Sequence, residues 1–280
     1  MQIRRLAGAA LLAGAALAVG ACRRDARERP NAFSWGDELA PGSTVHVRTM
    51  NGNVTVRGTA ERRAHVQGIK RWHRGRERDV RFVVTRSGDD VHLCAIWVRH
   101  GGRCGDERYG PRPPRLLAMF SLFRRRTDMS ASFEIMLPSG VRVDASTVNG
   151  RVVVTEAGGD VKAETVNGDI RASTMGGALA LTTVNGSIRA RAASLAKDAA
   201  VRLETVNGSV RAELPPSVDA DVHLVTVNGK ITTDFPLAVR GAMSSREVRG
   251  MLGEGGRPIE LKTVNGSVEL RQTGSGGPIP

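Results

Sequence analysis

The stretch Val161-Lys-Ala-Glu-Thr-Val-Asn-Gly-Asp-Ile170 is followed one unit later by Leu179-Ala-Leu-Thr-Thr-Val-Asn-Gly-Ser-Ile188, and this repeat decides the fold. A Thr-(Val/Met)-Asn-Gly motif occurs seven times in the chain. Its Asn-Gly pairs are Asn51-Gly52, Asn149-Gly150, Asn167-Gly168, Asn185-Gly186, Asn207-Gly208, Asn228-Gly229 and Asn265-Gly266. Copies spaced by about 20 residues indicate a solenoid or another repeat array before any other fold.

Apolar residues alternate with polar ones on both sides of each Asn-Gly pair. The residue three positions after the Asn is always Val or Ile, and the residues four and six positions before it are apolar, as Leu181 and Leu179 are. A period of two on each side of a bend predicts the arrangement strand, bend, strand.

Two all-β folds satisfy this pattern. In an antiparallel β-meander, each Asn-Gly pair forms a type I′ hairpin turn, which leaves the Val before every Asn on the exposed face. In a repeat-built β-solenoid (β-helix-like), each Thr-Val-Asn-Gly forms a corner where that Val turns inward. The Asn and Thr side chains of successive coils then form hydrogen-bonded ladders. We favour the solenoid because it buries the Val, and the meander is the alternative.

The composition favours thin strands and an anionic partner. Aromatic residues make up 4% of the 280 residues and hydrophobic residues 40%, and most of the latter are Val, Ala, Leu and Ile, which suit strands. The net charge of +13 comes almost entirely from arginine. Such a surface favours phospholipid headgroups, lipopolysaccharide, acidic glycans or nucleic acid. The alternative is an ordinary soluble surface that is rich in arginine.

Residues 1–21 have the pattern of a secretory signal peptide, with a basic start and an apolar run too short to span a membrane comfortably. The run ends in Val19-Gly-Ala-Cys22, which resembles the lipobox of bacterial lipoproteins. That resemblance implies cleavage before Cys22 and attachment of diacylglycerol to its thiol. The alternative is ordinary cleavage with Cys22 as a bystander. Arg23, where lipoproteins retained in the inner membrane often have aspartate, implies a lipid-anchored envelope protein in the outer membrane, facing the periplasm.

Beyond the signal, residues 22–38 are predicted as a flexible linker, residues 39–272 as the β-strand-repeat domain and residues 273–280 as a disordered tail. An irregular basic insertion spans about residues 103–128 of the domain. Cys94 and Cys104 flank a short glycine-containing loop, and in an oxidising periplasm this spacing predicts a disulfide. A metal pair supported by nearby histidines is the weaker alternative, because the spacing matches no standard zinc site, and no metal is expected.

Two basic clusters are candidate sites for an anion or a membrane. In the first, Arg71 and Arg74 flank Trp72, a mixture that suits phosphates, acidic sugars or a headgroup plane. The alternative is a strand edge protected from aggregation by its charge. In the second, apolar residues of the insertion lead into the run Arg124, Arg125 and Arg126, as in a segment that lies in a membrane interface. The alternative is a loop that caps the open end of the solenoid.

The order of these parts resembles a known family. A lipoprotein-type signal leads into Val-x-Val-x-Thr-x-Asn-Gly-x-Val from Val45 to Val54, the middle closes with Phe133-Glu-Ile-Met-Leu-Pro-Ser-Gly140, and tandem Thr-Val-Asn-Gly repeats follow. This pattern is similar to the bacterial β-strand-repeat family labelled "putative adhesin", a domain of unknown function, over about residues 39–272. The resemblance implies a β-helical architecture and brings no catalytic residues. The basic insertion departs from the family's plainer pattern.

The chain contains no motif that predicts an enzyme. It has no Gly-x-Ser-x-Gly elbow, no P-loop and no Cys-x-x-Cys pair. We therefore expect a non-enzymatic cell-envelope lipoprotein that presents a β-solenoid surface for adhesion, scaffolding or envelope-stress sensing, without a cofactor. The alternatives are a carbohydrate-active enzyme on a β-helical frame and a basic module that binds anionic lipid or lipopolysaccharide. Its expected partners are the membrane, reached through the N-terminal lipid, and an anionic envelope ligand such as lipid, lipopolysaccharide or acidic glycan. Nucleic acid is not expected, because the chain is exported and has no element that reads bases. The oligomeric state stays open.

Overall fold

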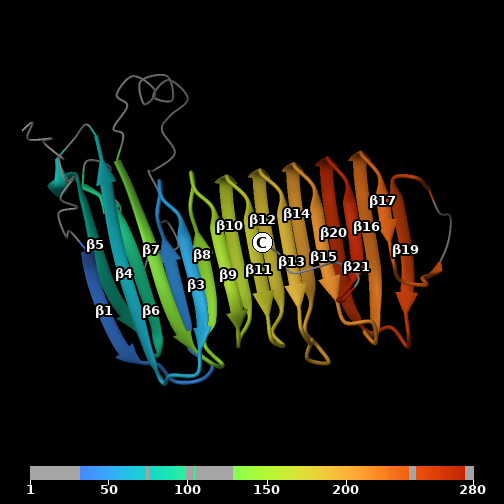
Figure 1. Ribbon diagram of the computed structural model, residues 1–280, viewed down its shortest axis with the longest axis horizontal. Helices are drawn as coiled ribbons and strands as arrows, with labels where there is room; N and C mark the ends of the chain where they lie inside the picture. Colours follow the sequence, from blue (N-terminus) through green and yellow to red (C-terminus); the bar gives the residue numbers. More distant parts are fainter. Residues whose placement is uncertain (1–31, 74–75, 99–103, 105–128, 240–243, 275–280) are drawn as a thin grey trace, which may run out of the picture. The chain divides into compact units, whose positions relative to one another are not determined.

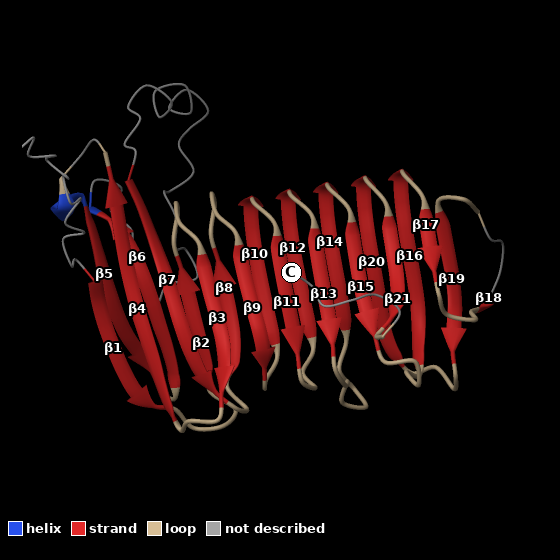
Figure 2. Cartoon of the chain, in the orientation of Figure 1, coloured by secondary structure: helices blue, strands red, loops and turns tan. Residues whose placement is uncertain are grey.

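The computed structural model describes residues 32–73, 76–98, 104, 129–239 and 244–274. The chain divides into two compact units, Met1–Pro30 and Asn31–Pro280, and every described residue belongs to the second. Most of the described residues are in β-strands (Figure 2), which confirms the all-β class predicted from the alternating pattern.

The strands form two sheets that enclose one core of Val, Ala, Leu and Ile side chains. Sheet A contains, in spatial order, β1 (Ala32–Glu38), β4 (Arg63–Trp72), β7 (Met129–Pro138), β3 (Val54–Thr59), β9 (Val152–Ala157), β11 (Ile170–Thr174), β13 (Ile188–Ala192), β15 (Val210–Leu214), β21 (Val268–Gln272) and β17 (Ile231–Thr233). Sheet B contains β18 (Ala238–Val239), β19 (Glu247–Leu252), β16 (Ala220–Asn228), β20 (Arg257–Asn265), β14 (Val201–Asn207), β12 (Leu179–Asn185), β10 (Val161–Asn167), β8 (Arg142–Ser146), β2 (Thr44–Arg48), β6 (Asp90–Trp97) and β5 (Val80–Ser87). A 3₁₀ turn, η1 (Glu77–Asp79), precedes β5.

Each motif copy connects a strand of sheet B to a strand of sheet A, and the copies stack on one another. β12, for example, ends at Asn185, and β13 begins at Ile188 in the other sheet. β12 pairs in parallel with β14, and Asn185 lies opposite Asn207. A meander of hairpins would require antiparallel neighbours. The parallel pairing therefore confirms the β-solenoid and excludes the meander for these repeats.

At the six corners that contain Val, the Thr points into the core and the Val points outward, so the prediction that this Val is buried is wrong. Thr183 is 1% exposed, whereas Val184 is 38% exposed. The reason is that β12 keeps its alternation up to the corner, so Leu179, Leu181 and Thr183 share the inner face. The buried Thr183 hydroxyl donates to the Gly168 carbonyl of the neighbouring coil at 3.0 Å. A Val side chain could not make this bond.

The Asn side chains form the predicted ladder along the corners. Nδ2 of Asn167 donates to Oδ1 of Asn149 at 2.8 Å, and the same bond joins Asn185 to Asn167 and Asn207 to Asn185 at 2.9 Å. The Gly that follows each Asn allows the coils to approach this closely. A Cβ atom on Gly186 would lie 2.0 Å from a carbonyl oxygen of the neighbouring coil. The Asn-Gly pair therefore serves the stacking of coils rather than a hairpin turn.

The last motif copy does not lie at the end of the stack. β20 pairs with β14 on one side and with β16 on the other, and β21 lies between β15 and β17. In Figure 1 the red β20 and β21 therefore stand between orange coils that precede them in sequence. The segment between these last two copies contains β18 and β19, and β19 runs antiparallel along β16. These additional strands, β18 and β19, account for the long sequence gap before the last motif copy.

At the other end of the stack the strands are antiparallel. β1 pairs with β4, and β4 pairs with β7. The predicted linker, residues 22–38, overlaps β1, which begins at Ala32. β1 belongs to the sheet because Phe33 and Trp35 pack against the core. The structure therefore moves the start of the β-domain from the predicted residue 39 to residue 32.

Cys94 and Cys104 form a disulfide, with their Cα atoms 5.6 Å apart. Cys94 is fully buried in β6. Of the predicted insertion, residues 103–128, the structure describes only Cys104. Both thiols are consumed by this bond, so they are not available as metal ligands. His92, one of the histidines close to Cys94 in sequence, stacks on His46, with ring centroids 4.4 Å apart.

Candidate functional site

The two sheets present outer faces with different arrangements of charge. On sheet B, residues two apart in a strand share the outer face, and several of them pair. Lys162 Nζ lies 3.2 Å from the Glu164 carboxylate, and Lys262 Nζ lies 2.9 Å from that of Glu260. The outer face of sheet B thus neutralises much of its own charge.

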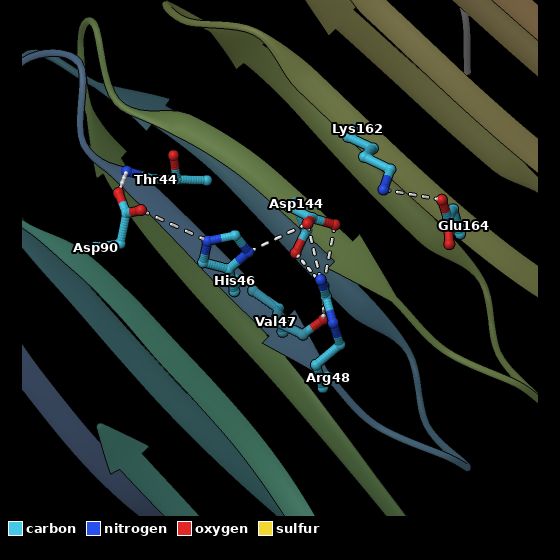
Figure 3. Close-up of polar contacts among 8 residues, drawn as sticks. All are labelled: Thr44, His46, Val47, Arg48, Asp90, Asp144, Lys162 and Glu164. Carbon is cyan, nitrogen blue, oxygen red and sulfur yellow. Dashed lines mark hydrogen bonds and ion pairs between the residues drawn. The ribbon is translucent and has the colours of Figure 1, made fainter. Parts of the chain in front are cut away.

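A polar cluster joins three strands of sheet B (Figure 3). Arg48 donates to the two carboxylate oxygens of Asp144 at 2.7 and 3.0 Å, and His46 Nδ1 lies 3.1 Å from the same carboxylate. On its other side, His46 Nε2 lies 3.9 Å from Asp90, whose carboxylate accepts the backbone N–H of Thr44 at 2.7 Å. Side-chain contacts therefore hold β2, β6 and β8 together in addition to their backbone pairing.

The electrostatics of the polar cluster favour an ionised Asp144 and a neutral His92. Burial of the Asp144 carboxyl acts to raise its pKa, but the hydrogen bonds and positive charge of Arg48, with help from Lys162 and His46, hold the pKa below its usual value. Burial lowers the pKa of His92, and the positive charges of His46 and Arg48 act in the same direction. Both carboxylates of the cluster already have protein partners, so we assign it a structural role. Among the residues that the structure describes, no group of three or more His, Cys, Asp or Glu is placed to hold a metal ion.

The outer face of sheet A carries rows of arginine. Strand register places Arg171 of β11 opposite Arg189 of β13, and Ser173 of β11 opposite Arg191 of β13. Together with Arg57 of β3 and Arg151, which precedes β9, these arginines and the outer side of β9 line a groove of about 660 Å³. We call this depression the arginine groove. It crosses four neighbouring strands of the sheet, β3, β9, β11 and β13.

A β-bulge in β9 shapes the arginine groove. The register between β9 and β11 shifts there, and Glu156 is the one non-glycine residue with positive φ, 54°, in the described part of the chain. Its backbone N–H donates to the Ser173 hydroxyl at 2.8 Å. β3 makes room with Gly58, where a Cβ atom would lie 1.9 Å from the Glu156 carbonyl oxygen. A left-handed non-glycine residue costs about 1–3 kcal/mol, and such strain clusters at functional sites.

Most arginines of the groove have no carboxylate partner in the part of the chain that the structure describes. Across the ranges that the structure describes, no carboxylate oxygen lies within 4.0 Å of the side-chain nitrogens of Arg57, Arg151, Arg189 or Arg191. Further along the same face the pattern changes, because Arg211 lies 2.9 Å from Glu213. On this face Arg211 of β15 therefore has a carboxylate partner, whereas Arg57, Arg151, Arg189 and Arg191 of the groove have none among the described residues.

The chemistry of the arginine groove is that of anion binding. A guanidinium group stays protonated and presents a planar fork that matches carboxylate, phosphate or sulfate. Glu156 is the single carboxylate among the described residues that line the groove, and no His or Cys lines it. Acid–base hydrolysis of a glycan typically requires a pair of carboxyl groups. The lining that the structure describes does not supply such a pair.

The fold separates the first predicted basic cluster. Arg71 is exposed on β4, whereas Trp72 is half-buried and packs against the core. Consecutive residues of a strand point to opposite faces, so the structure does not bring these two side chains together into one surface. Cys22, Arg74 and the run Arg124, Arg125 and Arg126 lie outside the described residues.

Sequence reasoning missed the arginine groove, although one signal was present. Arg171, Arg189 and Arg211 each follow the Asn of a motif copy by four positions. In a solenoid, equivalent positions of successive copies stack, so a repeated arginine predicts a row of arginines. The bulge at Glu156, which shapes the groove, has no comparable sequence signal.

Comparison with known proteins gives one family match. Residues 142–271, from β8 into β21, match the family described as Toastrack DUF4097. Among curated proteins, no sequence matches this chain. No helix in the described residues is long and apolar enough to cross a membrane.

Two solved structures are similar in part. A protein described as a putative cell adhesion protein from Clostridium sporogenes is 12% identical, with a TM-score of 0.47, over 86% of this chain and all of that one. A protein described as a putative adhesin from Bacteroides fragilis is 9% identical, with a TM-score of 0.29, over 87% of this chain and 97% of that one. These scores are too low to assign a function.

Proposed function

We propose that the chain, whose residues 142–271 match the family described as Toastrack DUF4097, is a non-enzymatic cell-envelope lipoprotein whose β-solenoid presents a binding surface. The observation that carries the proposal is the arginine groove on sheet A. Guanidinium groups gather there, and in the described ranges those of Arg57, Arg151, Arg189 and Arg191 have no carboxylate partner. The described lining residues also include no acid–base pair. Such a surface suits a role in adhesion or scaffolding, in which an anionic envelope component is held rather than chemically changed.

Membrane attachment is the second part of the proposal. The signal-like residues 1–21 and the lipobox-like Val19-Gly-Ala-Cys22 support export followed by lipidation at Cys22. Arg23, at the position after the lipidated cysteine, supports sorting to the outer membrane. A lipid at residue 22 would tether the solenoid through the short segment before β1. A single acyl signal binds weakly, whereas the diacylglycerol expected here provides two chains.

Lipid labelling tests the anchoring. Cells that express the wild-type chain should incorporate a clickable fatty acid into it, and the protein should fractionate with membranes. A Cys22→Ser variant should lose the label and leave the membrane fraction, whereas a Cys94→Ala/Cys104→Ala variant controls for thiol chemistry elsewhere in the chain. Membrane association of Cys22→Ser equal to that of the wild type, together with an unlabelled wild type, would contradict lipidation.

An enzyme on the same frame is the competing class. It would turn over a polysaccharide and would need paired carboxyl groups at its site. Incubation of the purified chain with a panel of acidic and neutral polysaccharides, followed by analysis of new reducing ends, separates the two classes. We expect unchanged substrates. Turnover that disappears in Glu156→Gln would overturn the non-enzymatic assignment.

A further inference from the structure

We propose that the arginine groove binds an acidic glycan chain laid across β3, β9, β11 and β13. This inference rests on the proposed binding function and names the chemical class of its ligand. Glycan binding by the groove does not depend on lipidation at Cys22, so a negative result for one of these claims does not contradict the other.

The first argument is the charge of Arg57, Arg151, Arg189 and Arg191, which have no carboxylate oxygen within 4.0 Å of their side-chain nitrogens in the described ranges. Arg189 and Arg191 lie two residues apart in β13, so both side chains are on the outer face. Like charges this close together repel each other. The same face resolves this conflict at β15 and β21, where Arg211 lies 2.9 Å from Glu213 and 3.7 Å from Glu269. In the groove the missing anions would come from a ligand.

The second argument is the direction of the groove. Its arginines belong to successive coils, so they follow the stacking direction of the solenoid rather than a single strand. Arg171 and Arg189 lie one strand spacing apart, about 4.8 Å, whereas β9 has Val153 and Thr155 at the corresponding outer positions between β3 and β11. A slender, extended polymer with several anionic groups can reach the arginines on both sides of β9, and each carboxylate or sulfate can accept both donors of one guanidinium fork.

The third argument concerns the form of the groove. The bulge at Glu156 and the absence of a side chain at Gly58 recess this part of the face. Val153, Thr155 and Ser173 supply a small floor with one apolar side chain and two hydroxyls. A sugar ring presents both C–H groups and hydroxyls, so this mixture suits it.

The lining favours a glycan over two other polyanions. Surfaces that lie on lipid combine basic residues with large apolar or aromatic side chains, and proteins that hold single-stranded nucleic acid use aromatic rings as stacking platforms. The described residues that line the groove include no aromatic side chain, and Val153 and Val154 are its largest apolar ones. Val154 is fully buried in the core, so it adds no exposed apolar surface.

A binding titration tests the proposal on the exported Cys22→Ser chain. The probe is a fluorescent oligogalacturonate, with a neutral oligosaccharide of equal length as its control. We expect saturable binding of the acidic probe that weakens as salt rises, because exposed ion pairs are screened. Arg189→Ala/Arg191→Ala should weaken binding about tenfold, since it removes two charge-assisted contacts.

A matched variant separates the site from net charge. Lys162→Ala/Arg202→Ala removes the same charge from the outer face of sheet B and should leave the affinity unchanged. Glu156→Gln removes the carboxylate that lines the groove and should tighten binding severalfold, a gain that a purely structural role would not produce. Equal losses in both double variants would overturn the groove as the site.

Two further probes test the ligand class. Vesicles containing anionic phospholipid and a single-stranded oligonucleotide should bind more weakly than the acidic oligosaccharide, and their binding should respond equally to both double variants. If either bound more tightly than the glycan and lost affinity only in Arg189→Ala/Arg191→Ala, the glycan assignment would be wrong. No binding of the acidic probe at low salt would also overturn it.

Discussion

Replacing Gly186 with alanine should separate two coils of the solenoid. A Cβ atom at this position would lie 2.0 Å from the Gly168 carbonyl oxygen, and Cβ atoms essentially never approach other atoms within 3.0 Å. The two coils must therefore move apart by about 1 Å at this corner, because side chains this close to a backbone oxygen cannot rotate out of the contact. Neighbouring coils on both sides resist the movement.

The size of the effect follows from the bonds that cross the corner. Three are affected, namely Thr183 Oγ1 to the Gly168 carbonyl at 3.0 Å, Asn185 Nδ2 to Asn167 Oδ1 at 2.9 Å, and Gly168 N–H to the Asn185 carbonyl at 3.0 Å. A 1 Å shift stretches each beyond hydrogen-bond length. At about 1 kcal/mol for each bond, the free energy of unfolding should fall by about 3 kcal/mol.

Urea unfolding of the exported Cys22→Ser chain, followed by far-ultraviolet circular dichroism, measures this loss. Gly176→Ala is the matched control, because a Cβ there would meet its nearest neighbour, Ser194 Oγ, at 3.7 Å. That control should stay within about 0.5 kcal/mol of the parent. If Gly186→Ala were as stable as Gly176→Ala, the close stacking of Asn-Gly corners would be refuted.

Three further predictions concern stability. Thr183→Val should lower the free energy of unfolding by about 1–2 kcal/mol, because a buried carbonyl loses its donor, whereas the exposed Val184→Thr should stay within about 0.5 kcal/mol. Urea melts in which Val184→Thr lost more stability than Thr183→Val would contradict the corner geometry. Acid should destabilise the fold in two stages. Both His92 and Asp144 have lowered pKa values, so the folded state binds fewer protons. The free energy of unfolding should be highest at a pH above the usual pKa values of both groups. It should fall as the pH drops below about 6.5, through the lowered pKa of His92, and again below about 3.9, through the lowered pKa of Asp144. Asp144→Asn should reduce the second stage of a stability–pH profile, to which the lowered pKa values of Asp90 and Glu260 also contribute. An unchanged profile would count against the polar cluster. Cys94→Ala/Cys104→Ala should lower the free energy of unfolding by about 2–3 kcal/mol, measured by thermal melting. A loss below about 0.5 kcal/mol would show that the disulfide does not constrain the unfolded chain.

The solenoid could be predicted from the sequence because its repeat is strict. The period-two pattern around each Asn-Gly identified the strands and the inward-facing residues such as Leu179 and Leu181. The error over Val184 came from assuming that a corner interrupts the alternation. In fact the alternation continues, and Thr183 is accepted in the core because its hydroxyl has a partner. A hydrophobicity argument alone ranks Val above Thr for burial and misses that bond.

The spatial order of the coils and the arginine groove were harder to predict. Equivalent copies have almost the same sequence, so nothing local indicates that β20 inserts between β14 and β16. The groove depends on register across four strands and on the bulge at Glu156. Such features arise from contacts between residues far apart in sequence. The second predicted cluster, at residues 124–126, lies outside the described residues and stays a prediction.

Photo-cross-linking in intact cells tests the central claim, that the outer face of sheet A is the binding surface. A photoreactive amino acid is introduced at Val153 in the arginine groove, and at Ala180, which is exposed on the outer face of sheet B, as the control. After irradiation, mass spectrometry of the purified protein should find an acidic sugar adduct at position 153 and none at position 180. The same adduct at both positions, or an adduct at position 180 alone, would contradict the assignment.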